Sequence, residues 1–304
     1  MKPTGLDWRG VMPAMTTPFG PTGEIDHDFA RRHAQWMVEA GCTGIIAPGS
    51  LGEGNTLRLD ERAALWQTLV EAVGAQAPVI AAISALSTAE AVAMAQLAAA
   101  RGCRGLMVLP PYVYRGDWPE MRAHVEAVFA ATPLPCMLYN NPVAYGTDFI
   151  PEQIAELAER NANLLAVKES STDLRRLTGI RALLGDRLAL LVGVDDAIVE
   201  GIGAGAIGWV AGLVNAFPHE SVALFEAARR GGIDEAFALY RWFLPLLRMD
   251  TVPKFVQLIK LAQQEVGWGT EAVRPPRLPL TGSEREQALA EIRAALRERP
   301  APTA

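Results

Sequence analysis

The strongest constraint on the fold is a regular alternation of short apolar segments with longer amphipathic ones. The apolar segments predict eight strands, at residues 11–15, 44–47, 79–83, 105–109, 136–140, 164–168, 188–193 and 206–211. These segments are apolar on both faces, which is typical of a parallel sheet that is covered by helices. Eight βα units are the number that closes a barrel with a side-chain-filled interior. The alternation therefore predicts an α/β protein with a (β/α)8 TIM barrel, although an open doubly wound sheet can also use eight strands.

The length of the chain fits this barrel together with a smaller unit. At roughly 150 residues per domain, 304 residues suggest about two domains, but a barrel of this kind occupies such a length as one. The eight units lie within residues 1–230. Residues 231–304 predict helices at 233–249, 252–266 and 282–299, interrupted by a proline-rich segment at 274–279 that cannot stay helical. We expect this helical extension to pack on the barrel.

Charge and cysteine content limit the partners of the protein. The chain carries 34 acidic and 28 cationic side chains, a formal net charge of −6, which argues against a basic surface for nucleic acid or an anionic membrane. No apolar run reaches the roughly 18 residues of a membrane span, and the N-terminal segment does not resemble a secretory signal. Cys42, Cys103 and Cys136 are widely spaced, so they predict buried thiols rather than disulfides or a zinc site. We expect a cytoplasmic protein without metal or cofactor.

Lysine is scarce in this chain, and one lysine lies where a barrel places its chemistry. Among the 28 cations only four are lysines, and Lys168 directly follows the apolar strand segment 164–167. Reactive residues of such barrels lie at the C-terminal ends of strands. Desolvation there disfavours an ammonium ion, which makes a lysine amine nucleophilic. A lysine that pairs with Glu169 or snorkels to solvent is the alternative, but arginine would serve both purposes. We expect Lys168 to be a Schiff-base lysine, and Lys254 and Lys260 to be solvated or snorkelled.

Two further strand ends carry polar groups. Tyr139 ends the strand that precedes the strand of Lys168, so the two side chains are expected side by side, and a phenol there can transfer protons. The alternative is an amphipathic tyrosine at a barrel mouth. Residues 49–53 form a glycine-punctuated turn whose N–H groups can bind a carboxylate, with the Ser50 hydroxyl as a donor or relay. An ordinary βα turn is the alternative for this segment.

The sequence gives little support for dinucleotide binding, a metal site or a Ser-His-Asp triad. Residues 203–208 match GxGxxG in letters, but they follow a helix and enter a strand, whereas dinucleotide binding needs the reverse order. Asp195 and Asp196 have no histidine beside them, so helix capping is the better interpretation, with one carboxylate facing the site as an option. A metal site or a Ser-His-Asp triad is poorly supported. All four histidines fall on predicted helices or at a helix start: His27, His33, His124 and His219.

With these residues in place, the sequence resembles the N-acetylneuraminate lyase and dihydrodipicolinate synthase superfamily of class I Schiff-base lyases. The resemblance covers nearly the whole chain and is carried by four motifs: Thr16-Thr17-Pro18-Phe19, Gly49-Ser50-Leu51-Gly52-Glu53, Tyr139-Asn140-Asn141-Pro142 and Lys168-Glu169-Ser170-Ser171. It implies a homotetramer of barrels with extra C-terminal helices, a Schiff base between Lys168 and a small 2-oxo acid or its cyclic imine, proton transfer by Tyr139, and a catalytic Ser50. The expected substrate-binding residues are Gly49, Leu51, Gly52, Asn141, Tyr112 and Val210.

Three departures concern the substrate. Leu51 stands where dihydrodipicolinate synthases usually carry the second of two threonines, and Ala144 stands where they carry an arginine for the carboxylate of the second substrate. The tyrosine that they borrow from a neighbouring subunit corresponds to Val113, with Tyr112 or Tyr114 as substitutes. These departures disfavour dihydrodipicolinate synthase activity.

The C-terminal segments 240–247, 269–271 and 274–280 are similar to a subgroup from hydroxyproline catabolism, the 1-pyrroline-4-hydroxy-2-carboxylate deaminases. That resemblance implies attack of Lys168 on C2 of the cyclic imine, loss of the 4-hydroxyl as water, and hydrolysis to ammonia and 2,5-dioxopentanoate. The same Schiff base suits a 2-keto-3-deoxy sugar acid dehydratase or a pyruvate aldolase. A barrel that binds a small acid for regulation, without turnover, is the non-enzymatic alternative.

Overall fold

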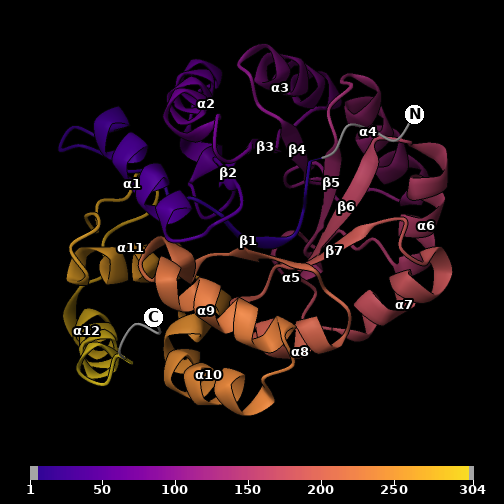
Figure 1. The fold of residues 1–304 in the computed structure, drawn as a ribbon. Coiled ribbons are helices and arrows are strands. Elements are labelled where there is room, and N and C mark those ends of the chain that lie inside the picture. The colour runs from indigo at the N-terminus through magenta and orange to yellow at the C-terminus, as the bar shows by residue number, and fades with distance from the viewer. Residues whose placement is uncertain (1–5, 301–304) are drawn as a thin grey trace.

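The computed structural model describes residues 6–300, in which eight parallel strands form a barrel surrounded by helices (Figure 1). The strands are β1 (Gly10–Pro13), β2 (Ile45–Ala47), β3 (Val79–Ile83), β4 (Gly105–Val108), β5 (Cys136–Asn140), β6 (Leu164–Glu169), β7 (Ala189–Val192) and β8 (Gly208–Ala211). They are ordered β1-β8-β7-β6-β5-β4-β3-β2. A parallel bridge between Ala14 and Ile46 joins the two ends of this sheet. The barrel prediction is confirmed, and the predicted strands differ from the observed ones only at their ends.

Helices follow the strands in alternation and begin where the sequence carries capping groups. They are α1 (His27–Glu39), α2 (Leu59–Val73), α3 (Thr88–Ala100), α4 (Trp118–Ala130), α5 (Pro142–Tyr145), α6 (Pro151–Arg160), α7 (Arg175–Leu184), α8 (Ile198–Gly203) and α9 (Pro218–Arg229). Ser87 caps α3 by accepting from the Glu90 N–H at 3.2 Å. Asp117 caps α4 in the same way by accepting from the Glu120 N–H. The Glu120 carboxylate in turn accepts from the Asp117 N–H. These bonds satisfy N–H groups that a helix start leaves without partners.

Apolar side chains fill both the inside of the barrel and the layer between strands and helices. Inside the barrel lie Trp8, Met12, Ile46, Ile80, Ala82, Met107, Leu109, Met137, Tyr139, Ala166, Leu191 and Val210. Because this interior is packed, polar chemistry is confined to the rim. Cys42, Cys103 and Cys136 are buried free thiols, as predicted, and burial raises the pKa of each to about 12.

The C-terminal segment adds α10 (Ile233–Leu247), the short 3-10 turn η4 (Arg248–Thr251), α11 (Phe255–Glu265) and α12 (Gly282–Arg297). In Figure 1 these helices lie beside α9, α8 and α1, on one flank of the barrel. Trp242 of α10 contacts Phe217 edge to face and donates to the Ala295 carbonyl at 3.0 Å. Within residues 6–300, no helix combines the length and the apolar character that a membrane crossing requires.

The expectation for Lys260 is wrong. This α11 side chain is 2% exposed, and its Nζ bonds the Glu53 carboxylate at 2.6 Å and the Ala272 carbonyl at 2.7 Å. Glu53 is fully buried and also accepts from the Arg274 N–H at 2.9 Å. The pair forms only because α11 folds over the turn after β2. Lys254 behaves as expected, since it is exposed and pairs with Glu284 at the surface.

Replacing Lys260 by methionine should lower the free energy of unfolding by about 3 kcal/mol, because it leaves the Glu53 carboxylate buried without its main counter-charge. Lys254→Met removes a surface pair and should change the free energy of unfolding by less than about 0.5 kcal/mol. Denaturant unfolding measures both. The double variant Glu53→Gln/Lys260→Met should recover part of the loss. Equal effects of the two single lysine changes would contradict a stabilising buried pair.

Candidate active site

Lys168 and Tyr139 lie side by side at the C-terminal ends of β6 and β5. They are register partners in the parallel pairing of these strands, and both are at least nine-tenths buried. The Lys168 Nζ lies 4.1 Å from the centroid of the Tyr139 ring. Glu169 points elsewhere, because its carboxylate accepts from Asn140 Nδ2 at 3.0 Å and from the Ser171 N–H at 2.6 Å. The alternative in which Lys168 pairs with Glu169 is therefore wrong.

A second phenol, which the sequence analysis missed, joins this pair. Tyr145 on the short helix α5 forms a hydrogen bond between its hydroxyl and Ser50 Oγ. Its ring meets Tyr139 edge to face at 5.8 Å and Tyr112 at 5.7 Å between centroids. Burial, with Tyr139 beside it, raises the pKa of Tyr145 well above its usual value. The Tyr145 hydroxyl thus stays protonated and connects Ser50 to the neighbourhood of Tyr139.

Local sequence explains the position of Tyr145. Asn141 caps α5 by accepting from the Ala144 N–H at 3.0 Å, Pro142 is the first helical residue, and Gly146 ends the helix at a φ of +73°. Asn141 also donates from Nδ2 to the Tyr139 hydroxyl at 3.0 Å. Tyr145 lies one helical turn after Asn141 and therefore on the same side. This Asn-Pro start and Gly stop were the available signal.

The turn after β2 presents free backbone donors. Within residues 6–300, the N–H groups of Ser50, Leu51 and Gly52 donate to no protein acceptor. Thr17 fixes the turn by donating from its hydroxyl to the Gly52 carbonyl at 2.6 Å, and a Cβ at Gly52 would stand 2.7 Å from a backbone oxygen after β1. The Gly49 carbonyl accepts from the N–H of Gly54, the first residue of the 3-10 turn η1 (Gly54–Thr56), at 2.9 Å. Such exposed N–H groups can bind a carboxylate.

Asp195 does not cap the helical turn at its own position, so that interpretation is corrected. It lies in the 3-10 turn η2 (Asp195–Ala197) after β7, which makes no side-chain cap. Its carboxylate instead accepts from the Gly212 N–H, from the Leu213 N–H at 2.7 Å and from Trp209 Nε1 at 3.0 Å. Burial raises its pKa to about 6, against these bonds and the charge of Lys168. Asp195 thereby ties the loop after β7 to the loop after β8.

A hydroxyl without a partner lies against Lys168. A Cβ at Gly193 would collide with both Ser170 Oγ and Lys168 Cε, so these two atoms share one small space. Ser170 is 3% exposed, and its Oγ has no hydrogen-bond partner among the described residues. Glycine at position 193 is what admits both side chains.

The remaining expectations are placed as follows. Val210 lies in β8 within the packed barrel interior, in the same cluster as Tyr139. Residues 203–208 run from the end of α8 into β8, which rules out a dinucleotide loop. His33 bonds the Asn215 carbonyl at 2.8 Å, and burial lowers its pKa to about 4. Residues 6–300 contain no group of three or more His, Cys, Asp or Glu side chains that could hold a metal ion.

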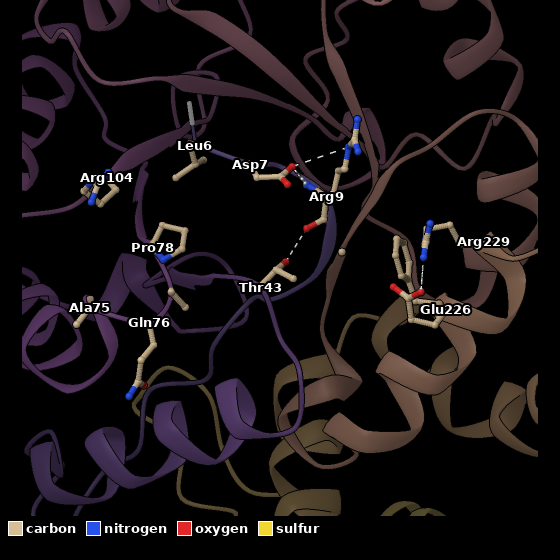
Figure 2. Close-up of a pocket in the computed structure, with 14 residues that line it drawn as sticks. Leu6, Asp7, Arg9, Thr43, Ala75, Gln76, Pro78, Arg104, Glu226 and Arg229 are labelled. Carbon is tan, nitrogen blue, oxygen red and sulfur yellow. Dashed lines mark hydrogen bonds and ion pairs between the residues drawn. The ribbon is translucent and has the colours of Figure 1, made fainter. Parts of the chain in front are cut away.

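A cavity of about 510 Å³ opens at the other end of the barrel, before the strands begin (Figure 2). Figure 2 shows Arg9, Thr43, Pro78 and Arg104 around it, each preceding or starting one of the first four strands. Its charges are partly neutralised, since Arg229 pairs with Glu226 at 2.8 Å. The cavity lies far along the strands from Lys168, and the site at the C-terminal ends is the one with the buried lysine and the phenols.

Comparison with known proteins agrees with this geometry. The model of the dihydrodipicolinate synthetase family matches residues 7–295. The chain belongs to this family. It is 33% identical over 293 residues to the 4-hydroxy-tetrahydrodipicolinate synthase of Moorella thermoacetica, covering 96% of this chain and 99% of that one. It is 34% identical over 289 residues to that of Parasynechococcus marenigrum, covering 95% of each chain.

Solved structures of family members have the same fold. A dihydrodipicolinate synthase from Bacillus anthracis superposes with a TM-score of 0.91 at 27% identity, covering 98% of this chain and all of that one. YagE from E. coli K12, a family member solved in complex with pyruvate, gives a TM-score of 0.90 at 25% identity, covering 96% and 99%. Members of the dihydrodipicolinate synthetase family are class I Schiff-base lyases. The protein is therefore an enzyme of this class that acts on a small substrate.

Proposed function

We propose that Lys168 forms a Schiff base with C2 of a small 2-oxo acid or its cyclic imine. The observation that carries this proposal is the contact between Lys168 and Tyr139, in which a buried lysine that forms no salt bridge within residues 6–300 lies against a phenol ring. The free N–H groups of Ser50 and Leu51 bind the substrate carboxylate beside C2.

In this scheme the two tyrosine hydroxyls transfer the protons. The neutral amine of Lys168 attacks C2, and Tyr139 returns a proton to the atom that leaves C2. Tyr139 then removes a proton from C3 once the Schiff base has formed. The hydrogen bond between Ser50 and Tyr145 provides a route by which protons reach the turn after β2.

For the substrate, we propose 1-pyrroline-4-hydroxy-2-carboxylate, with deamination to 2,5-dioxopentanoate and ammonia. Leu51 and Ala144 support this choice, because they remove the hydroxyl and the cation that synthases of the family use. The side chain of Leu51 is buried, and the methyl group of Ala144 supplies no charge. The C-terminal segments that resemble the deaminases point the same way. Dehydration of 2-keto-3-deoxy sugar acids and pyruvate aldolysis are the related reactions that the same Schiff base permits.

The test is ammonia release from the hydroxylated pyrroline carboxylate, followed with a coupled glutamate dehydrogenase assay. The expected result is turnover with this imine and at least about a hundredfold lower kcat/KM with 2-keto-3-deoxy sugar acids. Pyruvate release from the sugar acids with no ammonia release from the imine would contradict the deaminase assignment. A borohydride-trapped adduct with pyruvate in the same preparation shows that the protein is competent.

A second candidate is 4-hydroxy-tetrahydrodipicolinate synthase, the activity for which relatives at 33–34% identity are named. One structural feature favours it, because a Cβ at Gly146 would collide with the guanidinium of Arg115. Arg115 thus brings a cation close to Ala144 from a different loop. Condensation of pyruvate with aspartate semialdehyde, measured under the same conditions, distinguishes this candidate from the deaminase.

We also propose a cytoplasmic homotetramer. Large apolar side chains are exposed after three neighbouring strands, β3, β4 and β5, namely Leu86, Val113, Tyr114 and Val143. Exposed apolar groups on neighbouring segments are typical of protein interfaces. The molar mass in solution, measured by light scattering, tests the assembly.

A further inference from the structure

We propose that Asp250, from the C-terminal extension, is the acid that protonates the leaving hydroxyl of the substrate. This inference rests on the proposed deaminase function and assigns one of its steps. Asp250 lies in η4, the turn between α10 and α11, and η4 packs against η2 at the end of β7. On this side of Lys168 the barrel itself supplies one acid, Asp195, but its carboxylate is already held by the N–H groups of Gly212, Leu213 and Trp209.

Contact with Gly212 places Asp250 at the end of β8. A Cβ at Gly212 would collide with the Asp250 carboxylate, so glycine is the residue that lets this side chain approach the strand end. The N–H of the same Gly212 bonds the Asp195 carboxylate at 3.0 Å. Two acidic side chains therefore meet at Gly212, one from the barrel and one from the extension.

The two carboxylates differ in their hydrogen bonding. Both oxygens of Asp195 accept from backbone N–H groups, and Trp209 adds a third donor. Asp250 accepts no hydrogen bond from any protein donor within residues 6–300, and its side chain is partly exposed. Asp195, by contrast, is fully buried and has all its partners within the protein. The free carboxyl group of Asp250 is available to a ligand.

The electrostatic surroundings suit an acid. Burial and the nearby Asp195 raise the pKa of Asp250 well above its usual value, while Lys168 lowers it. The charged groups facing it are Lys168 from β6 and Asp195 and Asp196 from η2, and Arg248 of its own turn pairs with Asp196 at 3.6 Å. Asp250 therefore keeps its proton to a higher pH than an ordinary aspartic acid.

The order of the strands in the barrel places a group that can transfer a proton on each side of Lys168. Tyr139 on β5 lies next to Lys168 on β6, whereas Asp250 reaches the end of β8, with β7 between them. A substrate held at C2 by Lys168 can thus meet a phenol on one side and a carboxylic acid on the other. Elimination of water needs both, a base at one carbon and an acid at the next.

The assigned step balances without another reactant. After Lys168 displaces the ring nitrogen from C2, the open chain carries its hydroxyl on C4 and its amine on C5. Tyr139, which has given its proton to the departing ring nitrogen, removes a proton from C3; the electrons of that C–H bond form C2=C3 while the C2=N electrons move onto the Schiff-base nitrogen. The nitrogen lone pair then re-forms C2=N, the C2=C3 electrons form C3=C4, the electrons of the C4–O bond leave with oxygen, and the proton of Asp250 goes to that oxygen, which leaves as water. The Schiff base at C2 is restored, and Asp250 regains a proton from solvent.

Asp250→Asn tests the assignment, because the carboxamide keeps the shape but cannot release a proton. With the hydroxylated pyrroline carboxylate, we expect kcat for ammonia release to fall at least about a hundredfold and KM to change less than about threefold. Borohydride should still trap an adduct on Lys168, now one that retains the hydroxyl. The fall of kcat as pH rises through the pKa of Asp250 should also be absent from the variant. Asp186→Asn, at a fully exposed carboxylate, is the matched control and should match the wild type.

Each other outcome overturns the inference. Ammonia release by Asp250→Asn within threefold of the wild type shows that another group supplies the proton. Loss of Lys168 trapping in parallel with ammonia release shows that Asp250 only positions the lysine. In both cases the deaminase function stands. If the wild type forms the pyruvate adduct but releases no ammonia from the imine, the proposed function fails and this inference fails with it.

Discussion

Lys168→Ala is expected to abolish the borohydride-trapped adduct and to lower kcat by at least about a thousandfold with any substrate of the enzyme. The reason is that Lys168 is the lysine in contact with the Tyr139 ring, while Lys254 is at the surface and Lys260 is held by Glu53. Mass spectrometry of the intact and digested protein, after incubation with pyruvate and borohydride, measures the adduct and its position.

Two controls separate loss of the nucleophile from loss of structure. Lys168→Arg keeps a cation next to the Tyr139 ring but supplies no amine for a Schiff base, so it should be as inactive as the alanine variant. Lys254→Ala should retain the adduct and full activity. An adduct of unchanged yield on another residue of Lys168→Ala would refute the assigned nucleophile.

Tyr139→Phe should lower kcat by about 10²- to 10⁴-fold, the range for removing a group that transfers protons. The ring that contacts Lys168 and the barrel interior is retained, so the fold and the adduct with pyruvate should persist at a slower rate of formation. Quenching with borohydride at successive times after pyruvate is added measures this rate, and steady-state assays give kcat.

Tyr145→Phe is the matched variant for Tyr139→Phe. It removes the hydroxyl that bonds Ser50 but leaves the Tyr139 hydroxyl and its bond from Asn141 intact. Its effect on kcat should be smaller, about tenfold, because Tyr145 contacts the ring of Tyr139 and not Lys168. If Tyr139→Phe stayed within threefold of the wild type while Tyr145→Phe lost more, Tyr145 rather than Tyr139 would be the proton-transfer residue.

The sequence predicted the barrel well because a barrel repeats one local pattern. Each strand is an apolar run of three to six residues, and each is followed by a helix whose start is set by nearby side chains such as Ser87 and Asp117. The errors lie at strand ends. The last strand, for example, was expected from residue 206 but begins at Gly208. The apolar residues begin before the first ladder pair there, so composition alone does not mark the boundary.

The site was predictable only in part. Tyr139 and Lys168 end consecutive strands, and parallel neighbours bring consecutive strand ends together, so their contact follows from local order. Asp195 was misjudged because a carboxylate at a helix start normally caps that helix, whereas here the backbone of the next strand end lies closer. The tertiary fold replaced a local partner by a distant one.

What the sequence alone determined is the set of βα units and the strand-end lysine that one of them carries, since both depend on patterns within a few residues. The tertiary structure decided three contacts between distant segments: Tyr145 with Ser50, Lys260 with Glu53, and Asp250 with Gly212. Each depends on the path of a loop or of the C-terminal extension, and such paths leave no period in the sequence. They form because the extension packs against the barrel. This packing brings together side chains whose local sequence, taken separately, predicts only exposure to solvent.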